Sequence, residues 1–333
     1  MKIKFFGIIA MTAVMVCAMA ACGGSGGGDD GSGKAKWIAV KNTTFGNTSV
    51  NQVIWGKDKF IAAGGIYSGE TAKMAYSPNG ITWTAVPLAG TAFDDYKYIR
   101  KIAWGNNMFV AVGSDYNTMA SSPDGITWTD ITGLRSYGDI AWGNNTFIAV
   151  GSNDAMAYSS DGITWTEKKW SEITDISFHT YNHLRGISWV NDRFIVWYQN
   201  KMAYSMDGDS WTEITDSPFV ADYHGITHIV YGNGKYVAAG DFNRIAYSSN
   251  GVTWTRIKKE FANLTMGVAF GNNRFVLVES LGRTYTSTNG VSWTEINGAF
   301  NWKVNGAYCI GWGNNKFITG GREGNMAYWL PGK

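Results

Sequence analysis

The sequence predicts an all-β fold, a seven-bladed β-propeller with four-stranded antiparallel blades. One motif, Trp-Gly-Asn-Asn-x-Phe in its cleanest form, returns about every 43 residues, and a second, Ser-x-(Asp/Asn)-Gly-x-(Thr/Ser)-Trp-Thr, follows each of its first six copies. A period of roughly 40–50 residues made of short strands is typical of a propeller, with one blade per repeat. The first motif starts at Trp55, Trp104, Trp142, Trp189, Tyr231, Phe270 and Trp312. The second motif reaches its tryptophan at Trp83, Trp128, Trp165, Trp211, Trp254 and Trp293.

The two motif counts also predict how the ring closes. The seventh blade ends near Met326-Ala327-Tyr328, where the other blades still have a final strand to come. Near the N-terminus, residues 37–40 (Trp-Ile-Ala-Val) resemble residues 83–86 (Trp-Thr-Ala-Val) of a fourth strand. We therefore expect the N-terminal strand to close the last blade, which removes two open sheet edges.

The second blade shows how one repeat forms four strands. Gly, Asn and Asp cluster at three reversals, as hairpin turns with positive φ require, and β-branched and aromatic residues fill the segments between them. The expected strands are residues 99–104, 108–112, 118–122 and 126–131.

The N-terminus has the pattern of a targeting segment, predicted over residues 1–21. Lys2 and Lys4 precede an apolar run over residues 5–20. The sequence Met19-Ala20-Ala21-Cys22 resembles the lipobox of bacterial lipoproteins, which implies cleavage before Cys22 and lipidation of its thiol. Ordinary secretion with cleavage near the same alanines is the alternative. We expect export and lipid anchoring in the bacterial cell envelope, in the outer membrane, since Gly23 gives no Asp-type inner-membrane retention signal.

Beyond the leader, composition predicts a tether over residues 22–34 and one propeller over residues 35–333. The tether is rich in Gly and Ser and would span on the order of 20 Å. The 28 basic and 26 acidic residues nearly cancel, without a basic run, so nucleic acid is not an expected partner. After processing, Cys22 and Cys309 remain, and we expect Cys309 to be a buried, inert thiol. No cofactor is expected, and the propeller is expected to be a monomer.

The second motif resembles the Asp-box of sialidases and other BNR-type repeat proteins. It departs from that family in one respect, because the family has a residue between Asp and Gly and here the two are adjacent. The resemblance implies structural turns at the blade rim, remote from an active centre. A calcium loop would need several carboxylates close together, and each turn offers one or two, which favours the structural interpretation. The turn residues are Asn79, Asp124, Asp161, Asp207, Asn250 and Asn289.

The order of strands predicts two unlike faces. The first and third turns of every blade lie on one face, here called the repeated face, and their sequences are nearly identical. The second turns and the connections between blades lie on the other, the variable face, and differ from copy to copy. The general resemblance to propellers implies that a ligand binds at the mouth of the central channel on the variable face.

Aromatic, arginine and histidine side chains gather in the variable connections, as a sugar or peptide pocket requires. The candidate ligand-binding residues are Tyr98, Arg100, Tyr137, Trp170, His179, Tyr181, His183, Arg185, Tyr223, His224, Trp302 and Tyr308.

Each group of candidates also has a plainer explanation. Histidines commonly bond backbone, and the spacing of these four is no recognised metal-ligand pattern, so no metal is expected. Trp170 and Trp302 could instead cap apolar gaps beneath long connections. Arg100 and Arg185, both four residues before their motif tryptophan, could pack against Tyr or Asp neighbours. The four histidines are His179, His183, His224 and His228.

Three functions remain open, and we favour non-catalytic recognition of a glycan, peptide or protein. A sialidase-like glycosidase is the first alternative, for which the resemblance implies three arginines, a Tyr nucleophile with a Glu partner, and an Asp acid. The arginines would be Arg100, Arg185 and Arg135, and the acid Asp94, Asp95 or Asp222. The glutamates after the motif tryptophans, however, have the positions of solvated outer-strand residues: Glu167, Glu213 and Glu295. A structural platform in an envelope complex is the second alternative.

Overall fold

The computed structural model divides into two units, Met1–Gly33 and Lys34–Lys333, and every described residue belongs to the second. The structure describes residues 37–65, 72–94, 98–113, 118–178, 183–199, 201–217, 219, 225–240, 244–258, 261, 263–296 and 306–331.

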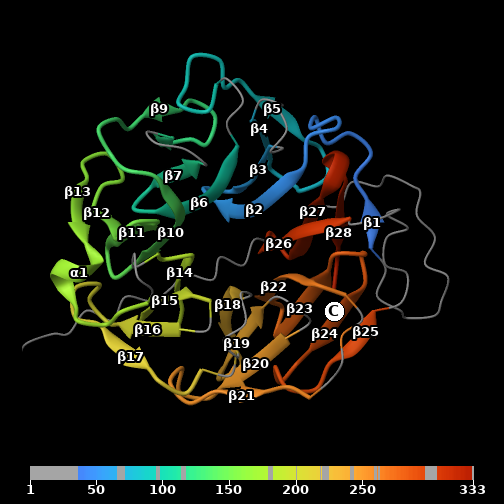
Figure 1. Ribbon diagram of the computed structural model, residues 1–333. Coiled ribbons are helices and arrows are strands. Elements are labelled where there is room, and N and C mark those ends of the chain that lie inside the picture. The colour runs from blue at the N-terminus through green and yellow to red at the C-terminus, as the bar shows by residue number, and fades with distance from the viewer. Residues whose placement is uncertain are drawn as a thin grey trace, which may run out of the picture. The chain divides into compact units, whose positions relative to one another are not determined.

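These residues form a seven-bladed propeller of four-stranded antiparallel sheets around a central axis (Figure 1). The inner strands are β2 (Val50–Gly56), β6 (Ile99–Gly105), β10 (Tyr137–Gly143), β14 (Gly186–Trp189), β18 (Ile226–Gly232), β22 (Thr265–Gly271) and β26 (Ala307–Gly313). The second strands are β3 (Lys59–Gly64), β7 (Met108–Gly113), β11 (Thr146–Gly151), β15 (Phe194–Tyr198), β19 (Lys235–Gly240), β23 (Arg274–Glu279) and β27 (Lys316–Gly321).

The two remaining strands of each blade complete the sheet toward the rim. The third strands are β4 (Lys73–Ser77), β8 (Met119–Ser122), β12 (Ala155–Ser159), β16 (Lys201–Ser205), β20 (Arg244–Ser248), β24 (Thr284–Ser287) and β28 (Met326–Trp329). The outer strands are β5 (Thr84–Val86), β9 (Thr129–Asp130), β13 (Thr166–Lys169), β17 (Thr212–Ile214), β21 (Thr255–Arg256), β25 (Thr294–Ile296) and β1 (Ile38–Ala39). Helix is confined, in the described ranges, to α1 (Trp170–Ile173) and the 3₁₀ turn η1 (Arg322–Gly324).

The predicted ring closure is confirmed by the seventh sheet, whose order is β1-β28-β27-β26. Ile38 lies opposite Tyr328 and Ala39 opposite Ala327, in antiparallel register. The first described strand of the chain therefore completes its last blade.

The hairpin chemistry of the first motif explains its asparagines. Asn106 and Asn107 form the two-residue loop between β6 and β7, with φ values of 44° and 58°. Positive φ at both loop positions is the geometry whose twist matches that of the flanking strands, and Asn tolerates it better than most residues. The same pair of positive angles recurs in the first turn of each blade.

The second motif closes its own turn by side-chain hydrogen bonds. In blade two, Asp124 Oδ1 accepts from the backbone N–H groups of Ile126 (2.7 Å) and Thr127 (2.8 Å), while Ser122 Oγ accepts from Gly125 N (2.8 Å). These bonds engage the amides of residues 126 and 127, so the outer strand β9 covers only Thr129–Asp130 and not the expected 126–131. The turn is self-contained, as an Asx turn should be.

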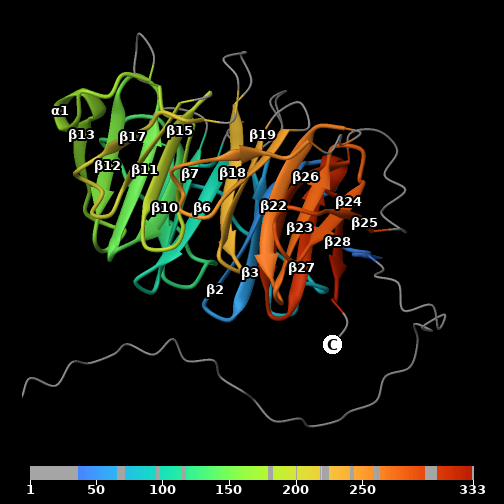
Figure 2. The ribbon, with the colours of Figure 1, turned by 90° about the horizontal axis from the view of Figure 1, so that it is seen from below.

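The two faces separate as the strand order requires. The inner strands begin on the variable face, which is turned toward the viewer in Figure 1, and run toward the repeated face. Figure 2 shows β22 running away from the face that carries α1. Among the described residues, no helix is long and apolar enough to cross a membrane.

Candidate ligand site at the channel mouth

A β-bulge near the start of the inner strands builds the mouth of the channel. In blade one, Val50 pairs with Gly64 and Gln52 with the adjacent Ala63, so Asn51 has no opposite residue. The same register shift occurs in β6, β10, β18, β22 and β26. A bulge re-aims side chains that regular alternation would send into the blade. In blade four, Arg185 occupies the equivalent position directly before β14.

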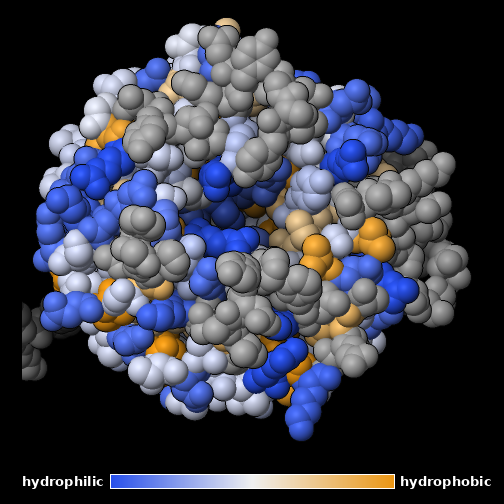
Figure 3. Space-filling view, in the orientation of Figure 1, coloured by the Kyte–Doolittle hydropathy of each residue, from blue (hydrophilic) through white to orange (hydrophobic). Residues whose placement is uncertain are grey.

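The residues at these seven positions all line one cavity of about 360 Å³ on the variable face. This mouth cavity is within the usual size range of small-ligand sites. Figure 3 shows a central hollow on this face lined largely by hydrophilic residues. The seven residues are Asn51, Arg100, Gly138, Arg185, Thr227, Met266 and Tyr308.

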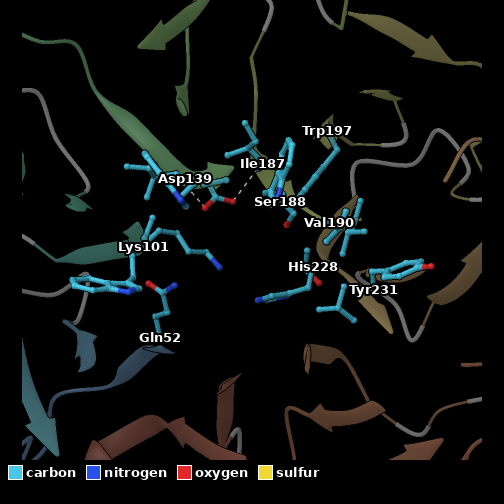
Figure 4. Close-up of a pocket in the computed structure, with 18 of the residues that line it drawn as sticks. Gln52, Lys101, Asp139, Ile187, Ser188, Val190, Trp197, His228 and Tyr231 are labelled. Carbon is cyan, nitrogen blue, oxygen red and sulfur yellow. Dashed lines mark hydrogen bonds between the residues drawn. The ribbon is translucent and has the colours of Figure 1, made fainter. Parts of the chain in front are cut away.

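A second cavity, of about 430 Å³, continues down the channel from the mouth. The residues that follow the bulge positions contribute Gln52, Lys101, Asp139 and His228 to its wall (Figure 4). The two cavities share five lining residues, so the mouth and the channel form one continuous space. The shared residues are Lys101, Asp139, Trp197, Thr227 and His228.

Two of the channel residues bind backbone and thereby tie neighbouring blades together. Asp139 Oδ1 accepts from Ile140 N (2.8 Å), and its Oδ2 accepts from Ile187 N of the next blade (3.2 Å). Gln52 Nε2 donates to Ile102 O of the next blade (3.1 Å), and Gln52 Oε1 accepts from the backbone N–H of Ile102. Burial raises the pKa of the Asp139 carboxyl, and the nearby charges of Lys101 and Arg100 oppose that shift.

The mouth carries more positive than negative charge. Arg100, Lys101 and Arg185 line it, and Asp139 is the one acidic residue among its described lining residues. The Arg100 guanidinium donates to the hydroxyl of Tyr98 (2.6 Å) and lies 5.1 Å from the centre of that ring. Arg100 is therefore held at the rim by an aromatic neighbour and still has a solvent-exposed side.

A glycine separates the two rim arginines. At the bulge position of blade three, between Arg100 of blade two and Arg185 of blade four, Gly138 has no side chain, and a Cβ there would lie 3.8 Å from the Arg100 guanidinium. A side cavity of about 340 Å³ opens here, lined by both arginines, Gly138 and His183. His183 Nδ1 accepts from Asn153 N (3.3 Å), and its ring lies 5.7 Å from that of Tyr198.

The structure thus brings together five of the candidate ligand-binding residues named from the sequence. Tyr98, Arg100, Arg185 and Tyr308 line the mouth, and His183 lines the side cavity.

Trp170 is placed differently, in the core. Its side chain is fully buried, its Nε1 donates to Ile176 O (2.6 Å), and its ring packs 5.2 Å from Phe178 and 5.2 Å from Trp211. This burial makes Trp170 part of the core and fits the alternative, that it caps an apolar gap.

Tyr137 is also buried, with its hydroxyl bonded to Glu167 (2.5 Å). Burial first, and then Glu167, raises the pKa of this hydroxyl. Arg135 lies beside the same carboxylate, with its Nε 3.9 Å from Glu167 and its backbone N–H donating to it (2.8 Å). Glu167 is an exposed residue of the outer strand β13, as expected, and its carboxylate also holds Tyr137 and Arg135. Tyr137 and Arg135 line neither the mouth nor the channel cavity.

Several expected contacts lie outside the described residues: His179, Tyr181, Tyr223, His224 and Trp302, together with Asp95 and Asp222. Among the residues that are described, no group of three or more His, Cys, Asp or Glu side chains could hold a metal ion.

Cys309 directly follows the bulge residue Tyr308 of blade seven, but its thiol is not a reactive group. Its thiol is buried and contacts the carbonyl oxygens of Val50 (3.6 Å) and Gly320 (3.7 Å). Burial raises its pKa to about 12, so the thiolate, which is the nucleophilic form, is not populated at neutral pH.

Sequence reasoning missed Trp197, Lys101, Asp139 and Gln52. Trp197 stands on β15 where the equivalent positions of the other blades carry Ala, Val or Gly. A Cβ on Gly186, its pairing partner, would lie 2.2 Å from the indole, so Trp197 uses the space that this glycine leaves. A comparison of second strands within the chain would have found it.

Family models and curated proteins give no match to this chain. Solved structures do match. YCF48 from Cyanidioschyzon merolae is 14% identical with a TM-score of 0.66, covering 89% of this chain and 99% of that one. A catalytically inactive virginiamycin B lyase from Staphylococcus aureus, with quinupristin, is 11% identical with a TM-score of 0.70, covering 89% and 99%. The WD40 propeller domain of Doa1 is 11% identical with a TM-score of 0.64, covering 90% and 97%. At these identities the likeness shows the propeller fold.

Proposed function

We propose that this protein is a non-catalytic recognition propeller that binds a peptide, protein or glycan ligand at the mouth of its channel. The observation that carries the proposal is the ring of bulge residues. Seven equivalent positions line one cavity, and they differ from blade to blade while the turns on the repeated face stay nearly constant. Variation among the residues that line an accessible cavity is expected where a repeat scaffold has specialised for a ligand.

The chemistry of the mouth supports binding over glycoside hydrolysis. A sialidase-like hydrolase would need a Tyr nucleophile with a Glu partner and a separate Asp acid, and most other glycosidases need two carboxyl groups flanking the scissile bond. The described lining residues offer one, Asp139, and both of its oxygens accept hydrogen bonds from backbone N–H groups. Arg135, the third arginine of a sialidase-like triad, lies beside Glu167.

Peptides have a specific place in the test because YCF48, which shares the fold, has also been solved bound to D1 peptide, at 13% identity and a TM-score of 0.65. Cationic rim residues and a half-buried aromatic such as Tyr308 suit an acidic or C-terminal peptide segment as well as an acidic sugar.

Thermal melting of the purified protein against panels of peptides, sugars and sialic acids tests the proposal. A ligand at a hundred times its dissociation constant stabilises by about 2.7 kcal/mol, on the order of 4 °C for a domain of this size. We expect Arg185→Ala to abolish that shift and Arg256→Ala, a matched change on the exposed outer strand β21, to leave it intact. Equal shifts in both variants would overturn the proposal.

We further propose that Cys22 is lipidated, that residues 22–34 tether the propeller, and that the protein is held at the outer membrane of a bacterial envelope, with the Asp-box-like turns serving as structural elements. The lipobox-like Met19-Ala20-Ala21-Cys22 supports the anchor. Metabolic labelling with an alkyne fatty acid should mark the protein and the Cys17→Ser variant equally, because Cys17 lies in the leader. Label that persists in Cys22→Ser would refute the anchor.

A further inference from the structure

The polar side chains inside the channel differ in whether they already have hydrogen-bond partners. The amide of Gln52 and the carboxylate of Asp139 are both used on backbone groups. The Lys101 ammonium, in contrast, makes no hydrogen bond or ion pair with any described residue, although it lines both cavities. The channel therefore holds a cation whose donors are available to whatever occupies the space.

His228 faces Lys101 across this space. Figure 4 shows the imidazole and the ammonium pointing toward each other, with Gln52 and Asp139 on either side. His228 Nδ1 is shielded from solvent and has no hydrogen-bond partner among the described residues. An orphaned buried N–H is rarer in proteins than an orphaned acceptor, so the neutral ring should carry its proton on Nε2, at the far edge that points into the channel.

We propose that the channel below the mouth binds a carboxylate group, held between the Lys101 ammonium and the Nε2–H of His228. A cation and a neutral N–H donor on opposite walls match the two oxygens of one carboxylate. The inference deepens the proposed function and rests on it, because it identifies the ligand as one that inserts an acidic group through the mouth.

The charges around His228 agree with this assignment. Burial, followed by the positive charge of Lys101, holds the pKa of the imidazole well below its usual range, so His228 is neutral at pH 7. The other titratable groups that line the two cavities are Asp139 on β10, Tyr231 on β18, Tyr308 on β26, and Tyr98, Arg100 and Arg185 at the mouth. The thiol of Cys309 on β26 is buried outside these linings. A carboxylate placed beside the ring would favour its protonated form and raise its pKa.

Acetate is the probe, because it carries the group without requiring contacts at the rim. A pH titration of His228, followed by imidazole ¹⁵N NMR and assigned with His228→Gln, would be run in sodium acetate and in sodium chloride at equal ionic strength. We expect the Nε2–H tautomer in chloride, a saturable rise of the pKa of His228 in acetate, and no rise with acetamide. The same titration in acetate and in chloride would overturn the proposal.

Substitutions at Lys101 test whether its charge, and not a loss of folding, determines the affinity for acetate. Lys101→Met should weaken acetate binding at least tenfold, Lys101→Arg should retain most of it, and Lys41→Met, an exposed control on the N-terminal segment, should match the native protein. If Lys101→Met melts at a much lower temperature, acetate binding is measured on His228→Gln instead. Calorimetry should then show weakened acetate binding to that variant. Unchanged acetate affinity in folded Lys101→Met or His228→Gln would contradict the site.

This measurement also distinguishes the two proposals. If no panel ligand binds at the mouth, the proposed function is wrong, and acetate binding in the channel can still be measured independently. If a panel ligand binds through Arg185 and Lys101→Met binds it equally well, the channel inference fails and the recognition proposal stands.

Discussion

The indole Nε1 of Trp37 donates a hydrogen bond to Thr284 Oγ1 at 3.1 Å, and both residues are buried. Trp37 precedes β1 in the seventh blade, whereas Thr284 starts β24 in the sixth. The first described residue of the chain is thus joined to two blades, since its ring also lies 5.9 Å from that of Trp329. Ring closure depends on an anchored tryptophan as well as on the short ladder of β1.

Trp37→Ala should therefore destabilise the propeller by about 3–5 kcal/mol, as expected for loss of a large buried aromatic. Ile38→Ala is the control, because Ile38 is the next residue and is 43% exposed, and it should change stability by about 0.5 kcal/mol. Urea unfolding followed by tryptophan fluorescence measures both. Equal effects would mean that closure does not depend on Trp37.

The first motif requires glycine because a side chain at this position would collide with the neighbouring blade. A Cβ on Gly105 would lie 2.0 Å from Cγ of Trp142, the motif tryptophan of the next blade. Gly105→Ala should force the two blades apart and cost about 1–3 kcal/mol or more. Gly138→Ala, whose Cβ would have 3.8 Å of clearance, should keep or slightly raise the melting temperature. A Gly105→Ala protein as stable as Gly138→Ala would contradict this packing account.

The turns of the second motif should contribute to acid sensitivity. Hydrogen bonds from the backbone amides of Ser210 and Asp209 and from Ser205 lower the pKa of Asp207 to about 2, and those from Ile163 and Thr164 lower the pKa of Asp161. A carboxyl whose folded pKa is depressed stabilises the fold above its unfolded pKa of about 4, and this contribution is lost as pH falls toward 2.

Asp161→Asn with Asp207→Asn should flatten the dependence of stability on pH between about 4 and 2, with little change at pH 7, because three blades already use Asn at this position. Urea midpoints across this range are the measurement. Asp58→Asn, at an exposed hairpin position where other blades have Asn, should keep the native slope. An unaltered slope in the double variant would show that these turns do not carry the acid response.

The fold could be predicted because every repeat carries its own turn chemistry. The pair Asn106-Asn107 specifies a hairpin, and Asp124 with Gly125 closes a turn whatever surrounds them. Such local signals, repeated along the chain, leave few alternatives to a ring of blades.

The channel wall could not be predicted in the same way. In a regular strand, neighbouring residues such as Arg100 and Lys101 face opposite sides, so placing Arg100 at the mouth sends Lys101 into the blade. The bulge in β6 lets both line the mouth cavity, and it leaves no signature in the sequence that reasoning on periodicity detects. The buried position of Trp170 could not be predicted for another reason. An aromatic residue in a long connection can cover the core as readily as it can face a ligand.

Site-specific photo-crosslinking in cells of the source organism tests the central claim, that the variable face binds and the repeated face does not. A photoreactive phenylalanine analogue would replace Tyr308 at the mouth or Ile163, which is 58% exposed in a turn on the repeated face. We predict light-dependent adducts at position 308 that are lost with Arg185→Ala, and none at position 163. Adducts at position 163 without any at position 308 would contradict the account.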